Sequence, residues 1–324
     1  MEFDGYWHQI RARIDEQLAV WIPEFFSDLT AQQGETIRQT LDAGKRTRGC
    51  LVCLTCGALG GDIAAAIPRA VAIECIQAAS LVHDDYVDGD QVRRDRPATW
   101  TLEGARKAVL LADMMFATVI QKMVQTSACD GEIVARVIAT IARGAYQEHL
   151  DLSDLALALA KGSYRPEFYD KIIHLKTGTL FGAAAQLGAV AAGASAHVSK
   201  DAFNFGARLG EAYQIADDLA DVCRIGHRQG GSPPSISVLV PVLLYFAREY
   251  TTEVLSLLKE RPNALSKFSK IALLAVKMNM RREISARLEL ATIEIIDFPE
   301  NSYTRLLHEM PKEIIRMSQA NNPS

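Results

Sequence analysis

The sequence predicts an all-α protein, and two observations carry that prediction. Apolar residues recur at helical spacing along nearly all of the 324 residues, and no alternating run of β-branched residues is long enough to form a strand. Two acidic triplets of the form Asp-Asp-x-x-Asp stand far apart, at 84–88 and 217–221. Because both lie in apolar helix, they are costly to bury unless they face a shared charged ligand. We therefore expect residues 1–324 to form one domain, a single large helical bundle with a central cavity.

Glycine, proline and polar clusters divide this chain into its expected elements. Helices are expected at about 3–29 (interrupted near Pro23), after a polar joint at 31–35, and at 49–59, 64–88, 102–125, 133–159, 202–223 and from 238 onward. A further helix carries residues 176–179, which break its pattern. Between the helices we expect a basic turn at 93–97, loops at 161–166 and 226–234, and a polar tail at 321–324.

Charge and hydropathy exclude several classes of protein. A net charge of -4 with a pI of about 6.0 leaves no basic stripe for nucleic acid. The N-terminal stretch is acidic and amphipathic, unlike a signal peptide. The longest weakly polar run, 181–196, contains Gln186 and is typical of a packed interior helix. We expect a cytoplasmic protein with no stable membrane insertion.

Three of the six cysteines, Cys50, Cys53 and Cys56, follow one another at one per helical turn. No fourth cysteine follows at the spacing of an iron–sulfur cluster. Their neighbours are apolar, which favours buried core residues over a metal site.

The first triplet places Asp84, Asp85 and Asp88 within roughly one third of a helix circumference, because residues advance by about 100° each. Close carboxylates resist ionising together unless a cation lies among them, and Mg²⁺ prefers such oxygen ligands. Arg93 and Arg94 follow, and arginine binds phosphate through its forked donors. An acidic helix end before a basic loop would explain this segment alone equally well.

The second triplet decides between these explanations. Asp217, Asp218 and Asp221 repeat the pattern, and Gln214 lies one turn before them on the same side of the helix. The simplest arrangement has the two triplets facing each other across a cavity, with metal ions and a diphosphate between them.

Five spaced elements occur in an order that resembles the trans-type polyprenyl diphosphate synthases, an all-helical family of isoprenoid synthases. The elements are Gly44-Lys45-Arg46-x-Arg48, Asp84-Asp85-x-x-Asp88, Arg93-Arg94, Lys176-Thr177 and Gln214-x-x-Asp217-Asp218-x-x-Asp221. The resemblance covers about residues 44–241. It implies a prenyltransferase that condenses isopentenyl diphosphate head to tail with an allylic diphosphate, using three Mg²⁺ ions per active site, and it implies a homodimer.

The resemblance also implies a role for each motif residue. Direct Mg²⁺ ligands would be Asp84, Asp88 and Asp217, with Asp85, Asp218 and Asp221 completing the shells. The allylic diphosphate would be held by Lys176, Arg93 and Gln214, with Thr177 beside Lys176. Isopentenyl diphosphate would be held by Lys45, Arg48 and Arg94, with Gln77 where many members have histidine. The catalytic set would be Asp84, Asp85, Asp88, Lys176, Asp217 and Asp218.

One departure from the family concerns the loop after the second triplet. Ser237 stands where members usually carry a lysine, ahead of Pro241. Arg224, His227 or Arg228 would have to substitute for that lysine.

Product length in the family is limited just before the first triplet. Here Ala79 and Ser80 are both small, which predicts a product of about C20 or longer. The residues Met114, Met115 and Phe116 would form a deeper floor or belong to the core.

Two alternatives remain open at this stage. A class I terpene cyclase on the same fold needs the metal site but not Lys45, Arg48 and Arg94. A non-catalytic regulatory partner subunit of another synthase would be expected to lose acidic triplets, and both are complete here.

Overall fold

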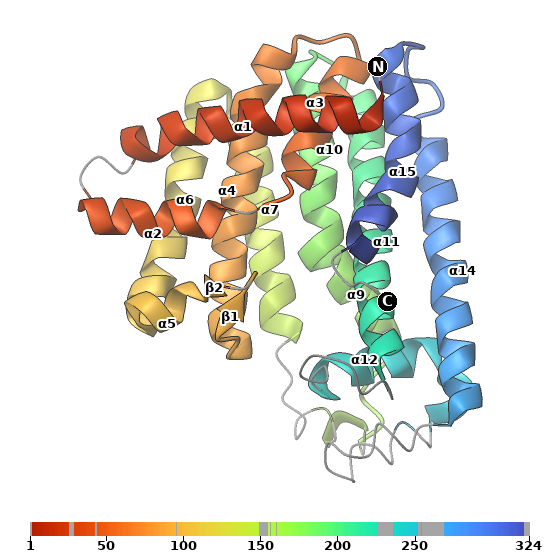
Figure 1. Ribbon diagram of the computed structural model, residues 1–324. Helices are drawn as coiled ribbons and strands as arrows, with labels where there is room; N and C mark the ends of the chain where they lie inside the picture. The colour runs from red at the N-terminus through yellow and green to blue at the C-terminus, as the bar shows by residue number, and fades with distance from the viewer. Residues whose placement is uncertain are drawn as a thin grey trace.

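The computed structural model describes residues 2–25, 29–42, 44–94, 96–148, 155, 157–159, 161–225, 236–251, 254 and 269–320. These residues form a helical bundle with one short β-ladder, which confirms the all-α prediction (Figure 1). The longer helices are α1 (Phe3–Phe25), α2 (Ala31–Leu41), α3 (Thr47–Ala58), α4 (Ile63–Asp88), α6 (Ala105–Thr126), α7 (Ala128–Glu148), α10 (Thr179–Ala191), α11 (Ala196–Arg224), α12 (Ile236–Phe246), α14 (Lys270–Glu294) and α15 (Ser302–Ala320). The short ones are α5 (Thr99–Glu103), α9 (Glu167–Ile173) and the 3₁₀-helix η2 (Arg248–Tyr250).

The long helices α4, α7, α10 and α11 pack together in the middle of the bundle; α1 crosses the bundle and packs on α3 and α4, and α2 packs against α4 (Figure 1). Helix α6 lies at one edge and α14 at the opposite edge. The acidic triplets lie near the ends of α4 and α11, so the bundle places both motifs at helix ends.

The start of α2 corrects one prediction. The expected polar joint at 31–35 is the first turn of the helix, because Thr30 and Gln33 form a capping box. The Thr30 hydroxyl accepts from the Gln33 backbone N–H at 3.3 Å, and the Gln33 side chain accepts from the Thr30 backbone N–H at 2.9 Å. The predicted break near Pro23 was placed too early, since α1 continues to Phe25.

The cysteines of α3 are core residues, as predicted. Cys50, Cys53 and Cys56 are fully buried and all six cysteines are free. Burial raises the pKa of Cys53 to about 12 and that of Cys56 to about 11, so these thiols stay protonated and apolar.

The predicted break in the helix through 176–179 is confirmed. Helix α9 runs into a π-helix, η1 (His174–Gly178), and then into α10. Helix α7 approaches this segment closely, because a Cβ on Gly144 would lie 2.9 Å from the Cβ of Leu175 and 3.0 Å from Cγ of Lys176. Residues 174–178 are therefore held against α7 through a glycine.

The basic turn at 93–97 contains two short strands that the sequence did not predict. Strands β1 (Val92–Arg93) and β2 (Arg96–Pro97) pair antiparallel, with Val92 opposite Pro97 and Arg93 opposite Arg96. Two-residue strands are too short for alternation to be visible in the sequence. Between them Arg94 has a left-handed φ of 53°.

Within the described part of the chain, two helices, α4 and α6, are long and apolar enough to cross a membrane by length and composition alone. In α4, 72% of the apolar window is buried inside the protein, as in a core helix, whereas in α6 only 33% is buried.

Helices α10 and α11 approach each other closely. A Cβ added to Gly206 would lie 2.3 Å from the backbone oxygen of Phe181, far inside contact distance. Only glycine at this position allows the two backbones to approach so closely. This contact sets α11, with the second triplet, against the segment that carries Lys176.

Replacing Gly206 by Ala should lower the free energy of unfolding by about 1–3 kcal/mol, because backbone atoms would have to move apart. Gly34→Ala in α2 is the matched control: nothing lies within 4 Å of its Cβ position. The Gly34→Ala change should raise the free energy of unfolding by about 0.5–1 kcal/mol. Urea denaturation measures both values, and equal stabilities for the two variants would contradict the close contact.

Candidate functional site

The first triplet occupies the last turns of α4, which ends at Gly89 with a left-handed φ of 72°. The Asp84 side chain is 26% exposed, Asp85 is buried, and Asp88 is exposed. Although the Asp88 residue reaches solvent, neighbouring groups partly desolvate its carboxylate, and this desolvation raises its pKa to about 6; Lys176 opposes that shift and Asp84 adds to it. The carboxylates thus sit in a partly buried region that lacks enough positive charge.

The middle carboxylate of this triplet is already engaged by the protein. Arg93 Nε donates to Asp85 Oδ1 at 2.7 Å, and a second guanidinium nitrogen contacts the same oxygen. The short β-ladder explains this pair, since it turns Arg93 back toward α4. In this state Arg93, predicted to hold a diphosphate, is paired with a carboxylate predicted to help bind metal.

Lys176 links the π-helix to the first triplet. Its Nζ lies 3.6 Å from Asp84 Oδ1 and also contacts Glu148, in the last turn of α7. Burial acts to lower the pKa of Lys176, but Asp84 and Glu148 raise it overall, so the amine is charged. Sequence reasoning missed Glu148, because no motif marks it and only the approach of α7 to η1 brings it here.

The middle carboxylate of the second triplet is buried and fully bonded. Asp218 Oδ2 accepts from the Tyr169 hydroxyl at 2.5 Å, and Oδ1 accepts from Gln214 Nε2 at 3.0 Å. Burial raises the pKa of Asp218 to about 7, although these bonds act to lower it. The Thr177 hydroxyl donates to Gln214 Oε1 at 2.9 Å, so adjacent residues of η1 face the two triplets.

The outer carboxylates of this triplet have different surroundings. Asp221 Oδ1 accepts from Arg224 at 3.0 Å, and burial raises its pKa while Arg224 opposes the shift. Asp217 is bonded to Tyr213, whose pKa is raised to about 12 by burial and then by Asp217. The first carboxylate, Asp217, thus shares its surroundings with the predicted basic residues.

The basic residues near Asp217 come from two distant segments. Burial lowers the pKa of Lys45, while Asp217 opposes and Arg94 reinforces that shift. Burial also lowers the pKa of Arg48, again against Asp217 and with Arg94. Lys45 and Arg48 thus each lie within electrostatic reach of Asp217 and of Arg94.

Arg48 is prepared to bind an anion. Its guanidinium lies over the Phe181 ring, 4.3 Å from the centroid, and its buried Nε has no hydrogen-bond partner among the described residues. A buried donor without an acceptor is costly, and an anionic oxygen would satisfy it. By contrast Arg46, in the same motif, is bonded to Asp15 and to the backbone oxygen of Leu41.

Two of the predicted substrate-binding residues make few side-chain hydrogen bonds. Arg94 donates to the backbone oxygen of Asp42 at 3.1 Å. Gln77 is half-buried on α4 and makes no hydrogen bond to another described residue. The side chain of Ser237, and residues 227 and 228, lie outside the described part of the chain.

The donor set fits Mg²⁺ only together with a ligand. Within the described ranges, no three His, Cys, Asp or Glu side chains lie close enough to hold a metal ion alone. The carboxylates are nevertheless hard oxygen donors, and Lys176 shows that a cation is attracted to Asp84. Because Mg²⁺ keeps waters and shares phosphate oxygens, a bound diphosphate would complete such a site.

The comparisons agree with the motifs. The sequence profile described as polyprenyl synthetase matches residues 32–230. A short chain isoprenyl diphosphate synthase from Methanothermobacter thermautotrophicus is 31% identical over 218 residues, which are 62% of this chain and 62% of that relative. The match to that curated relative thus spans less than two thirds of its length.

Solved structures share the fold over nearly the whole chain. A decaprenyl diphosphate synthase from Rhodobacter capsulatus has a TM-score of 0.79 at 21% identity, covering 98% of this chain and 99% of that one. A polyprenyl synthase from Caulobacter crescentus, complexed with calcium and isoprenyl diphosphate, has a TM-score of 0.72 at 25% identity and covers 97% of each chain.

Proposed function

This chain belongs to the polyprenyl synthetase family, and on that premise we propose that it is a prenyltransferase that condenses isopentenyl diphosphate with an allylic diphosphate. The observation that carries the proposal is the position of η1, where Lys176 contacts Asp84 and Thr177 bonds Gln214 beside the second triplet. One segment thereby joins both acidic motifs into one site.

The allylic diphosphate is assigned to the region between the triplets. Lys176 is the cation available to it, and exchange of Glu148 for a phosphate oxygen would free that amine for the substrate. Thr177 and Gln214 would orient the same group, and Arg93 would join after leaving Asp85. Asp84, Asp88 and Asp217 would hold Mg²⁺, because the middle aspartates, Asp85 and Asp218, are already bonded by protein donors. We propose three Mg²⁺ ions per site.

Isopentenyl diphosphate is assigned to Lys45, Arg48 and Arg94, with Gln77 as a further donor. The buried Arg48 Nε without an acceptor supports a second anion site. The two anions would be bound by different basic residues, which keeps the substrates in distinct positions.

The reaction follows from this division of charge. Mg²⁺ bound by the aspartates would supply the neutralisation that makes diphosphate a leaving group. Lys176 stabilises the charge that grows on the bridging oxygen as the allylic C–O bond breaks. The isopentenyl double bond then forms the new C–C bond to the allylic carbon, and the departing diphosphate takes the proton that is lost. No protein nucleophile is required.

Two other functions fit fewer of the observations. A terpene cyclase binds one diphosphate and leaves the group of Lys45, Arg48 and Arg94 unexplained. A non-catalytic subunit leaves two complete acidic triplets unexplained.

One incubation separates the three functions. Purified protein with Mg²⁺, an allylic diphosphate and labelled isopentenyl diphosphate should yield a longer, labelled diphosphate; an unlabelled hydrocarbon would indicate a cyclase, and no turnover a regulatory subunit.

Asp84→Ala should lower kcat by at least about a thousandfold, because it removes charge stabilisation at the metal site. Asp297→Ala, an exposed carboxylate in the turn after α14, is the control and should retain activity. Full activity in Asp84→Ala would contradict the metal assignment.

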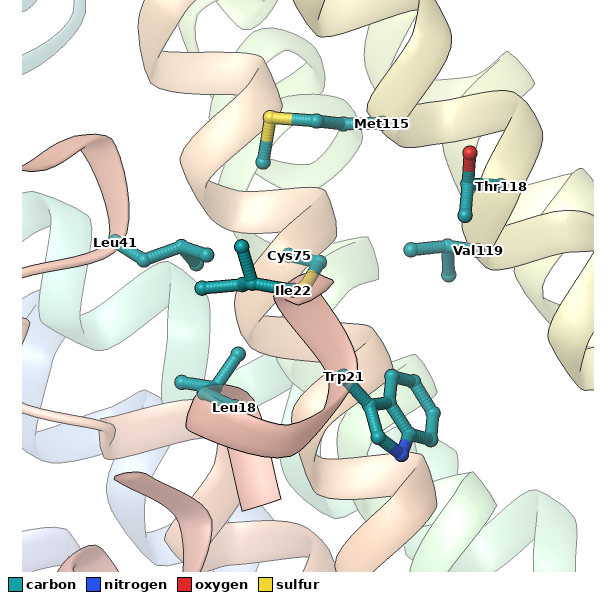
Figure 2. A pocket seen from close by; sticks show the side chains of 8 residues that line it. All are labelled: Leu18, Trp21, Ile22, Leu41, Cys75, Met115, Thr118 and Val119. Atoms are coloured by element: carbon teal, nitrogen blue, oxygen red, sulfur yellow. The ribbon is translucent and has the colours of Figure 1, made fainter. Parts of the chain in front are cut away.

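We further propose a product of about C20 or longer. Ala79 and Ser80 are small and buried on α4. Beyond them, Cys75 lies nine residues before Asp84, about 13 Å along the helix. There a void of about 10 Å³ opens between four helices, lined by Leu18, Trp21 and Ile22 of α1, Leu41 of α2, Cys75 of α4, and Met115, Thr118 and Val119 of α6 (Figure 2).

The three residues expected to form a deeper floor lie in different surroundings. Met115 lines it, Met114 faces a groove of about 220 Å³ between α2 and α6, and Phe116 contacts His83. Met115 is therefore the floor candidate, and its flexible side chain can yield to a growing apolar tail.

With farnesyl diphosphate as the allylic substrate, the wild-type protein should make products of C20 or longer. Met115→Ala should extend the longest product by at least one C5 unit, because it enlarges the space at the floor. Met123→Ala is the matched control: it is also buried in α6, two turns away and outside the void. Chain lengths are read by mass spectrometry. A wild-type product that stops at C15, or equal products from both variants, would contradict the assignment.

We also propose that the protein is a homodimer that pairs through α6. This apolar helix is mostly uncovered, and its Leu110 and Val124 side chains are 65% and 55% exposed. A second copy would bury this face. Because the partner copy would cover α6, this helix would not enter a membrane. We further propose that the chain forms one domain and works in the cytoplasm.

Leu110→Lys should weaken the dimer at least about tenfold, because it places a charge in an apolar interface. Ile271→Lys, on α14 at the opposite edge, is the control and should leave it unchanged. Sedimentation velocity reports both, and a wild-type monomer at micromolar concentration would refute the interface.

A further inference from the structure

The Tyr169 side chain touches the site from outside the recognised motifs. It lies on α9, is 5% exposed, and donates its hydroxyl proton to Asp218 Oδ2 at 2.5 Å. Its ring packs against Tyr245 and Phe246 of α12, with centroids 5.2 and 5.6 Å away. The ring is therefore fixed by packing, and the hydroxyl has one well-defined acceptor.

The Asp218 carboxylate connects Tyr169 to the π-helix through two further hydrogen bonds. Its other oxygen accepts from Gln214, and the Gln214 side-chain oxygen accepts from the Thr177 hydroxyl. The three hydrogen bonds thus run from α9 through α11 to η1. Thr177 is the neighbour of Lys176, so the orientation of η1 at the first triplet depends on this chain of bonds.

A second set of contacts holds α9 in place next to Tyr169. Asp170 is bound by Arg287 of α14, and the same guanidinium donates to Glu211 Oε2 of α11 at 2.5 Å. Arg287 is buried, and its remaining nitrogen donates to Glu283 at 2.8 Å. Buried ion pairs of this kind fix relative positions more than they add stability. Tyr169 thus reaches Asp218 from a helix that is anchored to both α11 and α14.

We propose that Tyr169 is a positioning residue of this site. It acts through Asp218 and Gln214 to hold Thr177, and with it the segment that carries Lys176, in register with both acidic triplets. The role in diphosphate binding rests on the function proposed above; the coupling between Tyr169 and η1 does not.

Loss of the hydroxyl would leave a buried carboxylate oxygen without its donor. The Asp218 carboxylate would then be free to turn, and Gln214 and Thr177 would lose a fixed orientation. The affinity for diphosphate should fall about tenfold, which corresponds to about 1.4 kcal/mol. The fold should persist, because the ring of a phenylalanine still fills the same space.

The first test uses ligand-free protein. Amide hydrogen exchange at residues 174–178 should be faster in Tyr169→Phe than in wild type. Tyr164→Phe is the matched control: this tyrosine lies five residues earlier, and its buried hydroxyl has no hydrogen-bond partner in the described structure. Exchange at 174–178 should be unchanged in the control. Unchanged exchange in Tyr169→Phe would overturn the proposal, whatever the protein's function.

The second test measures binding of inorganic pyrophosphate with Mg²⁺ by calorimetry, at a temperature where all variants are folded. Kd should rise about tenfold in Tyr169→Phe and stay constant in Tyr164→Phe. A double-mutant cycle with Thr177→Val should be non-additive, because the two residues act through the same bonds. Wild-type affinity in Tyr169→Phe, or additive effects, would overturn the positioning role. Absence of binding by the wild type would instead refute the proposed function.

Discussion

The carboxylates of the first triplet on α4 and of Glu148 on α7 lie in one partly buried region, and the arrangement of the site depends on the cations that neutralise them. Lys176 lies between Asp84 and Glu148, and Arg93 covers Asp85. The charged form of Asp88 is still disfavoured, because desolvation raises its pKa to about 6 and the nearby carboxylates Asp84 and Glu148 add to the shift. Like charges at this separation favour any cation that can enter. In the function proposed above, Lys176 and Arg93 would also bind diphosphate, so substrate binding would exchange these ion pairs for contacts with phosphate oxygens.

The π-helix is the local geometry that brings adjacent side chains to both acidic triplets. In a regular α-helix, adjacent residues point about 100° apart and are tied to one ladder of hydrogen bonds. The wider η1 turn lies where α7 approaches through Gly144, and it presents Lys176 to α4 and Thr177 to α11. π-Bulges are often found at functional sites because they place side chains that a regular helix cannot.

The two acidic triplets share a division of labour that their sequences hide. In each, the middle aspartate is the buried one and is held by protein donors: Asp85 by Arg93, and Asp218 by Tyr169 and Gln214. The first and last aspartates have fewer such constraints. Asp84 and Asp88 are accordingly better placed to meet a metal and a phosphate. In the proposed function, each Asp-Asp-x-x-Asp motif would combine one aspartate held by the protein with others that bind the metal.

The sequence by itself determined the all-α class, most of the helices, the break at 176–179 and the buried cysteines, because each depends on local periodicity or composition. It also identified the motifs whose residues the bundle gathers, since chemistry restricts which side chains can bind diphosphate. Only the tertiary structure decided which of those residues are paired and which are open to a ligand. Glu148 and Tyr169 belong to no motif and reach the site through helix packing, as does the void beside Met115. Such contacts depend on the distances between backbones far apart in the chain, and glycines such as Gly144 and Gly206 set those distances only once the helices meet.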